Sequence, residues 1–332
     1  MLPLIISGLV VIFSLNVFAQ ESDENPLVAD MPSTRKKVVY FTKFQTVTID
    51  HLSAGDLQLQ VAAGIITQKV AAESSSSSPI VFTIDNSATG VLGGAAVRYG
   101  ISDKLSVGSD FTYSQVKSET TTTVSGAPSD SADNQSGIQD IALRGQLVVD
   151  FNSFGYAANL RYLPTIGKAS SNSQTEESNS YREQSILGLQ NYLVFNTANI
   201  KWGGVLTYDY AFDGEVESIS SSGITSNRTV SGRNTLTAGG FVEFETLFKT
   251  NLTLNYQKVE SGTRTTQAGV VTDVPELTYL NFVGSVKLNI NQKWSIVPQF
   301  QYATVLNKDA DPTFSYTQVD IFGVSTSLRM NF

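Results

Sequence analysis

The chain contains no cysteine and a single histidine. Without cysteine it can form no disulfide, thiol nucleophile or thiolate metal site, and one histidine cannot complete a zinc coordination shell. A hydrolase with a histidine base would have to use His51, which lies beside a turn at 52–55, before the first predicted strand. We therefore predict no enzymatic activity, no metal site and no cofactor.

Charged residues are also scarce, at 16% of the chain, while apolar residues make up 41%. The net charge of −8 argues against nucleic acid as a partner. Only the first apolar run, at residues 4–18, is long enough to be considered as a membrane helix. If the rest of the chain crosses a membrane, it must do so with strands.

The last strand alternates apolar and polar residues and stops on a phenylalanine. Its apolar face consists of Phe322, Val324, Leu328, Met330 and Phe332, and its other face carries serines and Arg329. This alternation is typical of a strand with lipid on one side and water on the other. It resembles the last strand of bacterial outer-membrane β-barrels. That resemblance implies that Phe332 is an assembly signal for the barrel-assembly machinery.

Residues 56–332 repeat this pattern in runs of about ten residues or more. The runs are joined alternately by short and long connections. The short ones carry Asn, Asp, Ser or Thr, which favour tight turns, and lie at 101–104, 151–154, 196–199, 248–251 and 291–292. The long ones lie near 71–89, 117–136, 168–181, 214–231, 263–275 and 307–316.

Strict alternation of two connection lengths is typical of a chain that crosses a membrane back and forth. We predict an all-β fold, a transmembrane antiparallel up-and-down β-barrel of about 12 strands. A barrel of about 14 strands, which would use 38–49 and 80–85, is the alternative. With an even number of strands, both termini are expected in the periplasm of a Gram-negative bacterium, and the barrel is expected to contact outer-membrane lipid and lipopolysaccharide.

The N-terminus is expected to direct export. The apolar run ends with small residues before Gln20, so we predict a signal peptide at 1–19. No Lys or Arg precedes the run, which leaves an N-terminal membrane anchor as the alternative. Residues 20–55 do not fit the strand repeat, and we predict a periplasmic segment there that stays outside the barrel or enters its lumen.

The alternation assigns faces within the strands. On 104–116 the lipid face carries Leu105, Val107, Phe111 and Tyr113, and on 138–150 it includes Leu143 and Leu147. Two prolines lie inside predicted strands, where each removes a ladder donor. A bulge or a local opening is therefore expected at Pro164 and at Pro298.

Charged residues on the other face are candidates for controlling passage through the lumen. They are Arg98, Asp110, Asp140, Arg144, Arg161, Asp209, Glu243, Glu245, Lys287 and Arg329. The turn at 151–154 places Arg144 opposite Arg161, which is unfavourable unless a carboxylate or an anion lies between them. Asp140, Glu243 and Glu245 are the partners we predict. These charges form either a selective constriction or a salt-bridge network that fills the lumen.

Three short motifs carry a family resemblance. Residues 51–60 (HLSAGDLQLQ), 137–144 (GIQDIALR) and 159–167 (NLRYLPTIG) resemble segments of the outer-membrane channel family linked to the meta-pathway of phenol degradation. The third departs from the family pattern through Ile166, inserted before the glycine. The resemblance implies a passive channel for small solutes, often hydrophobic or aromatic. It would place Asp140, Arg144 and Pro164 among the marked positions of the family.

The predicted function is diffusion of small solutes through the lumen. The alternative is a non-conducting barrel whose long extracellular loops act in adhesion, phage reception or envelope integrity. The residues do not identify a particular solute.

Overall fold

The computed structural model describes residues 52–74, 81–151, 153–172, 175–179, 181–197, 199–220, 222–246, 248–267, 269–291, 293–307 and 314–332. His51, the predicted signal peptide and residues 20–51 of the predicted N-terminal segment lie outside these ranges. Every regular element within them is a strand. No helix in the described part of the chain is long and apolar enough to cross a membrane.

The strand segments build a closed barrel of twelve strands, which confirms the predicted number. Residues 82–85 begin one of these strands, so the fourteen-strand alternative does not hold. Six strands are continuous: β1 (Leu57–Ser74), β2 (Phe82–Ser102), β3 (Leu105–Val124), β4 (Ala127–Asp150), β17 (Trp294–Val305) and β18 (Phe314–Asn331).

The other six strands are each interrupted once and therefore appear as two segments. These pairs are β5 (Gly155–Leu163) with β6 (Ala169–Asn172), β7 (Glu177–Asn179) with β8 (Ile186–Thr197), β9 (Ile200–Ala211) with β10 (Gly214–Ile219), β11 (Thr225–Val230) with β12 (Asn234–Glu245), β13 (Lys249–Val259) with β14 (Gly262–Thr266), and β15 (Val271–Val274) with β16 (Leu277–Asn289).

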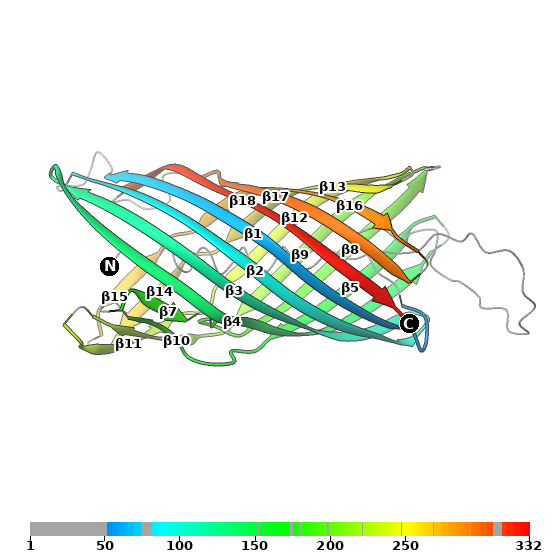
Figure 1. The fold of residues 1–332 in the computed structure, drawn as a ribbon, viewed down its shortest axis with the longest axis horizontal. Helices are drawn as coiled ribbons and strands as arrows, with labels where there is room; N and C mark the ends of the chain where they lie inside the picture. Colours follow the sequence, from blue (N-terminus) through cyan, green and yellow to red (C-terminus); the bar gives the residue numbers. More distant parts are fainter. Residues whose placement is uncertain are drawn as a thin grey trace, which may run out of the picture.

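The barrel closes between the first and last strands. β1 pairs antiparallel with β2 on one side and with β18 on the other. The N–H of Phe332 donates to the carbonyl of Leu57 at 2.8 Å, and the N–H of Leu57 donates back at 3.2 Å. We call the end that holds Phe332 and the short turns the turn end, and the opposite end the loop end. Figure 1 shows β18 and β1–β4 as long, tilted, neighbouring strands.

Apolar side chains cover the outside of the barrel, and polar side chains line most of its inside. On β3, Leu105, Val107, Phe111 and Tyr113 are between 39% and 42% exposed, whereas the intervening Asp110 is buried. A soluble protein buries such apolar residues, but a barrel in lipid exposes them as a belt. The predicted faces are therefore confirmed.

The predicted long connection at 117–136 is wrong. β3 and β4 stay paired up to Val124 and Ala127, and only Ser125 and Gly126 form the turn. Both turn residues have positive φ, 51° and 85°, as a two-residue type I′ hairpin requires. The threonines at 120–123 favour strand, so this polar segment extends the wall beyond the apolar belt. Residues 71–74 and 82–89, also predicted as connection, are strand as well.

Both prolines open the ladder locally, as predicted. Pro164 follows the last residue of β5, and the chain resumes strand structure only at Ala169. Pro298 pairs with Thr326 of β18. On its other side the β16–β17 ladder is interrupted between Ser285 and Leu288. The missing N–H of proline accounts for both openings.

The two strands of the hairpin β6–β7 have exchanged positions in the barrel wall. β7 pairs in parallel with β4, and β6 pairs in parallel with β10. An up-and-down order would instead place β6, the continuation of β5, beside β4. The segments that join the hairpin to β5 and β8 therefore cross.

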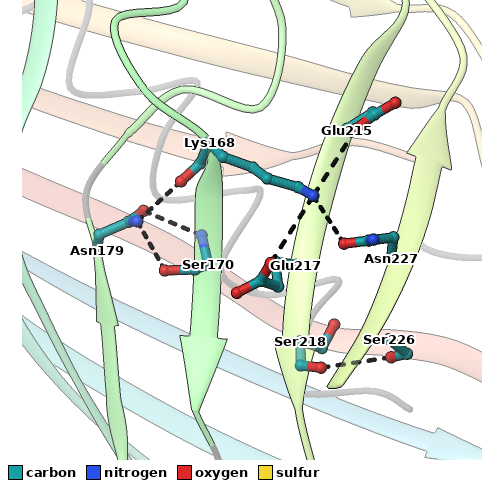
Figure 2. A network of polar contacts seen from close by, with 8 residues as sticks. All are labelled: Lys168, Ser170, Asn179, Glu215, Glu217, Ser218, Ser226 and Asn227. Atoms are coloured by element: carbon teal, nitrogen blue, oxygen red, sulfur yellow. Dashed lines mark hydrogen bonds and ion pairs between the residues drawn. The ribbon is translucent and has the colours of Figure 1, made fainter.

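Lys168 connects this hairpin to β10 and β11. Its Nζ donates to Asn227 Oδ1 at 2.7 Å and lies 3.8 Å from carboxylate oxygens of Glu215 and Glu217 (Figure 2). Asn179 donates from Nδ2 to the Lys168 carbonyl at 2.9 Å. The backbone and the side chain of one lysine thus connect β6, β7, β10 and β11.

Candidate solute site in the barrel lumen

Two arginines in the lumen share one aspartate. Arg98 on β2 and Arg144 on β4 both face Gly108 of β3 in register. Arg98 Nη2 lies 3.8 Å from Asp110 Oδ1, and Arg144 Nε contacts Asp110 Oδ2. A Cβ at Gly108 would meet the Arg98 side chain at 2.8 Å, so the glycine leaves the space in which this side chain lies.

Arg161 repeats this arrangement one strand further along. It lies opposite Arg144, as predicted, but it reaches across Gly188 to Asp209, with Nη2–Oδ2 at 2.7 Å and Nε–Oδ1 at 3.3 Å. A Cβ at Gly188 would overlap with both side chains. The predicted partners of these arginines were wrong, because Asp110 and Asp209 on neighbouring strands neutralise Arg144 and Arg161.

Asp140 has a partner that the sequence analysis missed. Arg182, just before β8, donates to both of its carboxylate oxygens, at 2.6 and 2.7 Å, and both side chains are buried. A β-bulge lies next to Asp140. The β3–β4 register shifts after Thr112, which leaves Gln139 as an extra residue and sets the direction of the Asp140 side chain. Arg182 lay next to a predicted loop, and no pattern in its own segment marks it as inward-facing.

A second group of charges lies at the turn end. Glu243, Lys287 and Arg329 are at most 3% exposed and each is engaged in an interaction. Glu245 accepts from the buried Lys201 Nζ at 2.5 Å. Lys201 was also missed, because it lies only two residues after the predicted short turn at 196–199. Arg98 lies opposite Gln58 of β1 and Arg329 opposite Gln60, so this group borders the cluster around Asp110.

A cavity of about 100 Å³ lies inside the barrel among β8, β9, β12, β13, β16 and β17. Arg161, Arg182, Arg233 and Asp209 contribute charge to its lining. Tyr192 and Phe241 contribute aromatic surface, with ring centroids 6.5 Å apart in an edge-to-face arrangement. Hydroxyls of threonines and amides of asparagines and glutamines complete the wall. The cavity therefore combines cationic, carboxylate, hydroxyl, amide and aromatic groups.

An apolar cluster occupies the loop-end half of the lumen. It includes Val70 of β1, Leu277 and Tyr279 of β16, Val305 of β17 and Ile321 of β18, all buried. Tyr279 lies close enough to Arg233 for electrostatic interaction. Apolar and charged lumen surfaces thus meet beside the cavity.

The described residues offer no group of three or more His, Cys, Asp or Glu side chains that could hold a metal ion. Phe332 has a side chain that is 62% exposed at the closing seam of the barrel. The predicted role of Phe332 in assembly concerns a partner and stays a prediction.

No family model matches the sequence, and a comparison with curated proteins finds no match. Among solved structures, the chain is similar to the COG4313 outer membrane channel from Pseudomonas putida F1, with a TM-score of 0.54, 12% identity and coverage of 85% of this chain and 97% of that one. It is also similar to the transport unit of the autotransporter AIDA-I from Escherichia coli, with a TM-score of 0.51, 6% identity and coverage of 98% and 97%. The fold is that of an outer-membrane β-barrel.

At these identities the likeness concerns the fold alone. The predicted resemblance to outer-membrane barrel channels is confirmed at that level. The two similar barrels carry different descriptions, a channel and an autotransporter unit. What the lumen of this chain does must therefore be argued from its own residues.

Proposed function

We propose that this chain is a channel in the outer membrane of a Gram-negative bacterium, through which small hydrophobic or aromatic solutes diffuse passively. The observation that carries the proposal is the cavity inside the barrel, whose wall mixes aromatic, hydroxyl and charged groups. Such a mixture of apolar surface with a few polar groups is typical of small-molecule sites. The similar barrel from Pseudomonas putida F1 is described as a channel, which supports the same reading.

The proposal includes a topology. The turn end would face the periplasm with both termini, and the loop end would face the exterior, as short turns and long connections do in other outer-membrane barrels. The exposed apolar belt would contact lipid and lipopolysaccharide. Transport by diffusion requires no catalytic group, so we infer a non-enzymatic role.

A surface role is the second candidate. The β3–β4 hairpin favours this role, because its strands stay paired up to Val124, beyond the apolar belt. This extended hairpin could contact a phage or another cell outside the membrane. In that case the charged clusters would only fill and stiffen the lumen.

Single-channel recording of the purified protein in planar bilayers separates the two candidates. We expect discrete conductance steps from the channel. Heat-modifiable, folded protein that inserts and yet gives no conductance would contradict the channel and favour the surface role. Folding can be checked on the same sample by the gel-mobility shift on boiling in detergent, because a closed barrel keeps its backbone groups paired until heated.

A further inference from the structure

A second cavity, of about 650 Å³, lies on the outer wall of the barrel and is lined mainly by β3, β4, β6, β7 and β10. On β3, Gln115 and Lys117 follow the lipid-facing Tyr113 at steps of two residues, so their side chains point to the same outer side. Ser136 of β4 pairs with Gln115, and Asn179 of β7 pairs with Ser136, so this side continues across the three strands. We call this space the outer cavity.

The outer cavity lies just beyond the apolar belt. Tyr113 ends the apolar face of β3, and Gln115 and Lys117 follow two and four residues later. These steps are about 7 and 14 Å along the strand, or heights of about 5 and 10 Å at a tilt of about 40°. The polar layer on each side of a bilayer core is roughly 5–8 Å thick. The outer cavity therefore begins within the layer of lipid head groups and extends just beyond it.

The exchanged hairpin β6–β7 supplies one wall of the outer cavity, and hydrogen bonds hold this wall in place. Asn179 Oδ1 accepts from the Ser170 N–H at 3.1 Å, and Asn179 Nδ2 donates to Ser170 Oγ at 2.7 Å (Figure 2). From β4, Gln135 Nε2 donates to the Asn179 carbonyl at 3.1 Å, and the Asn134 N–H donates to the Glu176 carbonyl at 2.8 Å. A wall fixed in this way loses little conformational freedom when a ligand binds.

The lining of the outer cavity is polar and carries little net charge. Five of its residues have amide side chains and four have hydroxyls, whereas two, Val116 and Ile219, are apolar. Lys117 is the only cation among the described lining residues, and its Nζ lies 2.8 Å from Glu119 Oε1. Glu177 adds a carboxylate to the lining. An anionic ligand therefore meets no uncompensated cation here.

Two polar side chains of the outer cavity are available to a ligand. Gln115 and Ser136 lie opposite each other on β3 and β4, and no hydrogen bond engages either side chain within the described residues. An amide and a hydroxyl both donate and accept hydrogen bonds. The hydroxyl groups of a sugar have the same two capacities, so this pair is suited to a sugar ring.

We propose that the outer cavity binds the sugar head group of a glycolipid of the outer leaflet, such as lipopolysaccharide. The acyl chains would lie against the apolar belt directly below, which favours a glycolipid over a free sugar. The volume of about 650 Å³ falls within the range of about 300–1,000 Å³ that ligand sites occupy. The site lies outside the lumen, so it rests on the proposed topology and not on conduction.

The test is surface plasmon resonance of the folded, full-length protein in detergent. The probe is rough lipopolysaccharide, which carries lipid A and core sugars, and phosphatidic acid is the anionic lipid without a sugar. We expect saturable binding of lipopolysaccharide, at least about tenfold tighter than binding of phosphatidic acid. Gln115→Ala should weaken it about threefold to tenfold, as for the loss of one or two hydrogen bonds. Ser136→Leu should weaken it by more, because the larger side chain fills the cavity floor.

Two control variants separate sugar recognition from other effects. Gln318→Ala removes an exposed amide on the outer side of β18, opposite Ala71 and outside the cavity, and should change the affinity by less than about twofold. Lys117→Gln should also have a small effect, because the charge it removes is already paired with Glu119. A loss confined to Lys117→Gln would indicate attraction of lipid phosphate and would overturn the sugar site. The gel shift on heating confirms that each variant is folded.

The core oligosaccharide released from the same lipopolysaccharide distinguishes a head group from a free sugar. It should compete only at an excess of about tenfold or more, because the lipid anchor raises the local concentration of the attached sugar. Competition at equimolar concentration would assign the site to free saccharides and overturn the glycolipid. Equal binding of phosphatidic acid, unchanged affinity in Ser136→Leu, or an equal loss in Gln318→Ala would overturn the site itself.

Bilayer recording tests the channel separately. A protein that conducts but shows no saturable lipopolysaccharide binding would retain the channel function and lose this site. A protein that binds lipopolysaccharide without conducting would retain the site and lose the channel.

Discussion

The substitution Leu143→Arg should report, through its cost in folding free energy, how deeply this part of the barrel wall lies in lipid. Leu143 is 52% exposed on the outer face of β4 and pairs with Ser109 of β3. Ser109 lies midway between Leu105 and Tyr113, the two ends of the apolar face of β3. Register therefore places Leu143 at the middle height of the belt.

The magnitude follows from this geometry. The eight steps from Leu105 to Tyr113 span about 27 Å along the strand, which a tilt of about 40° reduces to a height of about 21 Å. Leu143 then lies about 10 Å from either edge of the belt. Arginine costs about 2–4 kcal/mol at the midplane of a barrel and about 0–1 kcal/mol near an interface. Leu143→Arg should therefore exceed Leu105→Arg by about 2 kcal/mol, or roughly thirtyfold in the folding equilibrium.

The assay is urea titration of folding into lipid vesicles, with the folded fraction read from the gel shift on heating. Gln146→Arg serves as the control on the opposite face of β4, where Gln146 accepts from Ser106 Oγ at 3.3 Å. It should cost far less than Leu143→Arg, because its side chain does not enter lipid. Equal costs for Leu143→Arg and Leu105→Arg would refute the assigned depth, and equal costs for Leu143→Arg and Gln146→Arg would refute the faces.

Two further predictions concern charged groups. Replacing Arg144 and Arg161 together by Gln removes their charges from beside Asp110 and Asp209, so the reversal potential in a salt gradient should shift toward cation preference; an unchanged value in a conducting protein would make the pair purely structural. Burial raises the pKa of Asp133 in the folded protein. At a pH above this raised pKa, the ionised carboxylate lowers the free energy of unfolding. This loss disappears once the pH falls below the pKa of Asp133 in the unfolded chain. Asp133→Asn should therefore slow amide exchange in β7 at about pH 7 and change little at about pH 3.5; the opposite order would contradict the sign.

The alternation of side chains was sufficient to predict the barrel. A strand between lipid and a polar lumen must alternate with period two, and the runs at 104–116 and 320–332 do so over most of their length, with Ser109 and Thr326 as polar exceptions on the lipid face. The short turns could be placed for the same reason, because each ends two such runs. The number of strands and the lipid faces followed from these two features.

The extent of the strands could not be predicted in the same way. Beyond the belt both faces of a strand contact water, so alternation disappears, and the threonine- and serine-rich arms of the β3–β4 hairpin look like loop. Only the turn chemistry of Ser125–Gly126 marks the hairpin. The crossing of β6 and β7 depends on parallel pairing with β10 and β4, distant segments that a single sequence does not relate to one another.

The charges of the lumen show most clearly why a site is harder to predict than a wall. Arg161 and Asp209 meet because Gly188 lies between them on the intervening strand. The three residues are far apart in the chain and join only through the register of three strands. Since such pairs cancel, the number of arginines facing the lumen says little about selectivity. What matters is which charges stay uncancelled, and that depends on the register of neighbouring strands rather than on any single run of residues.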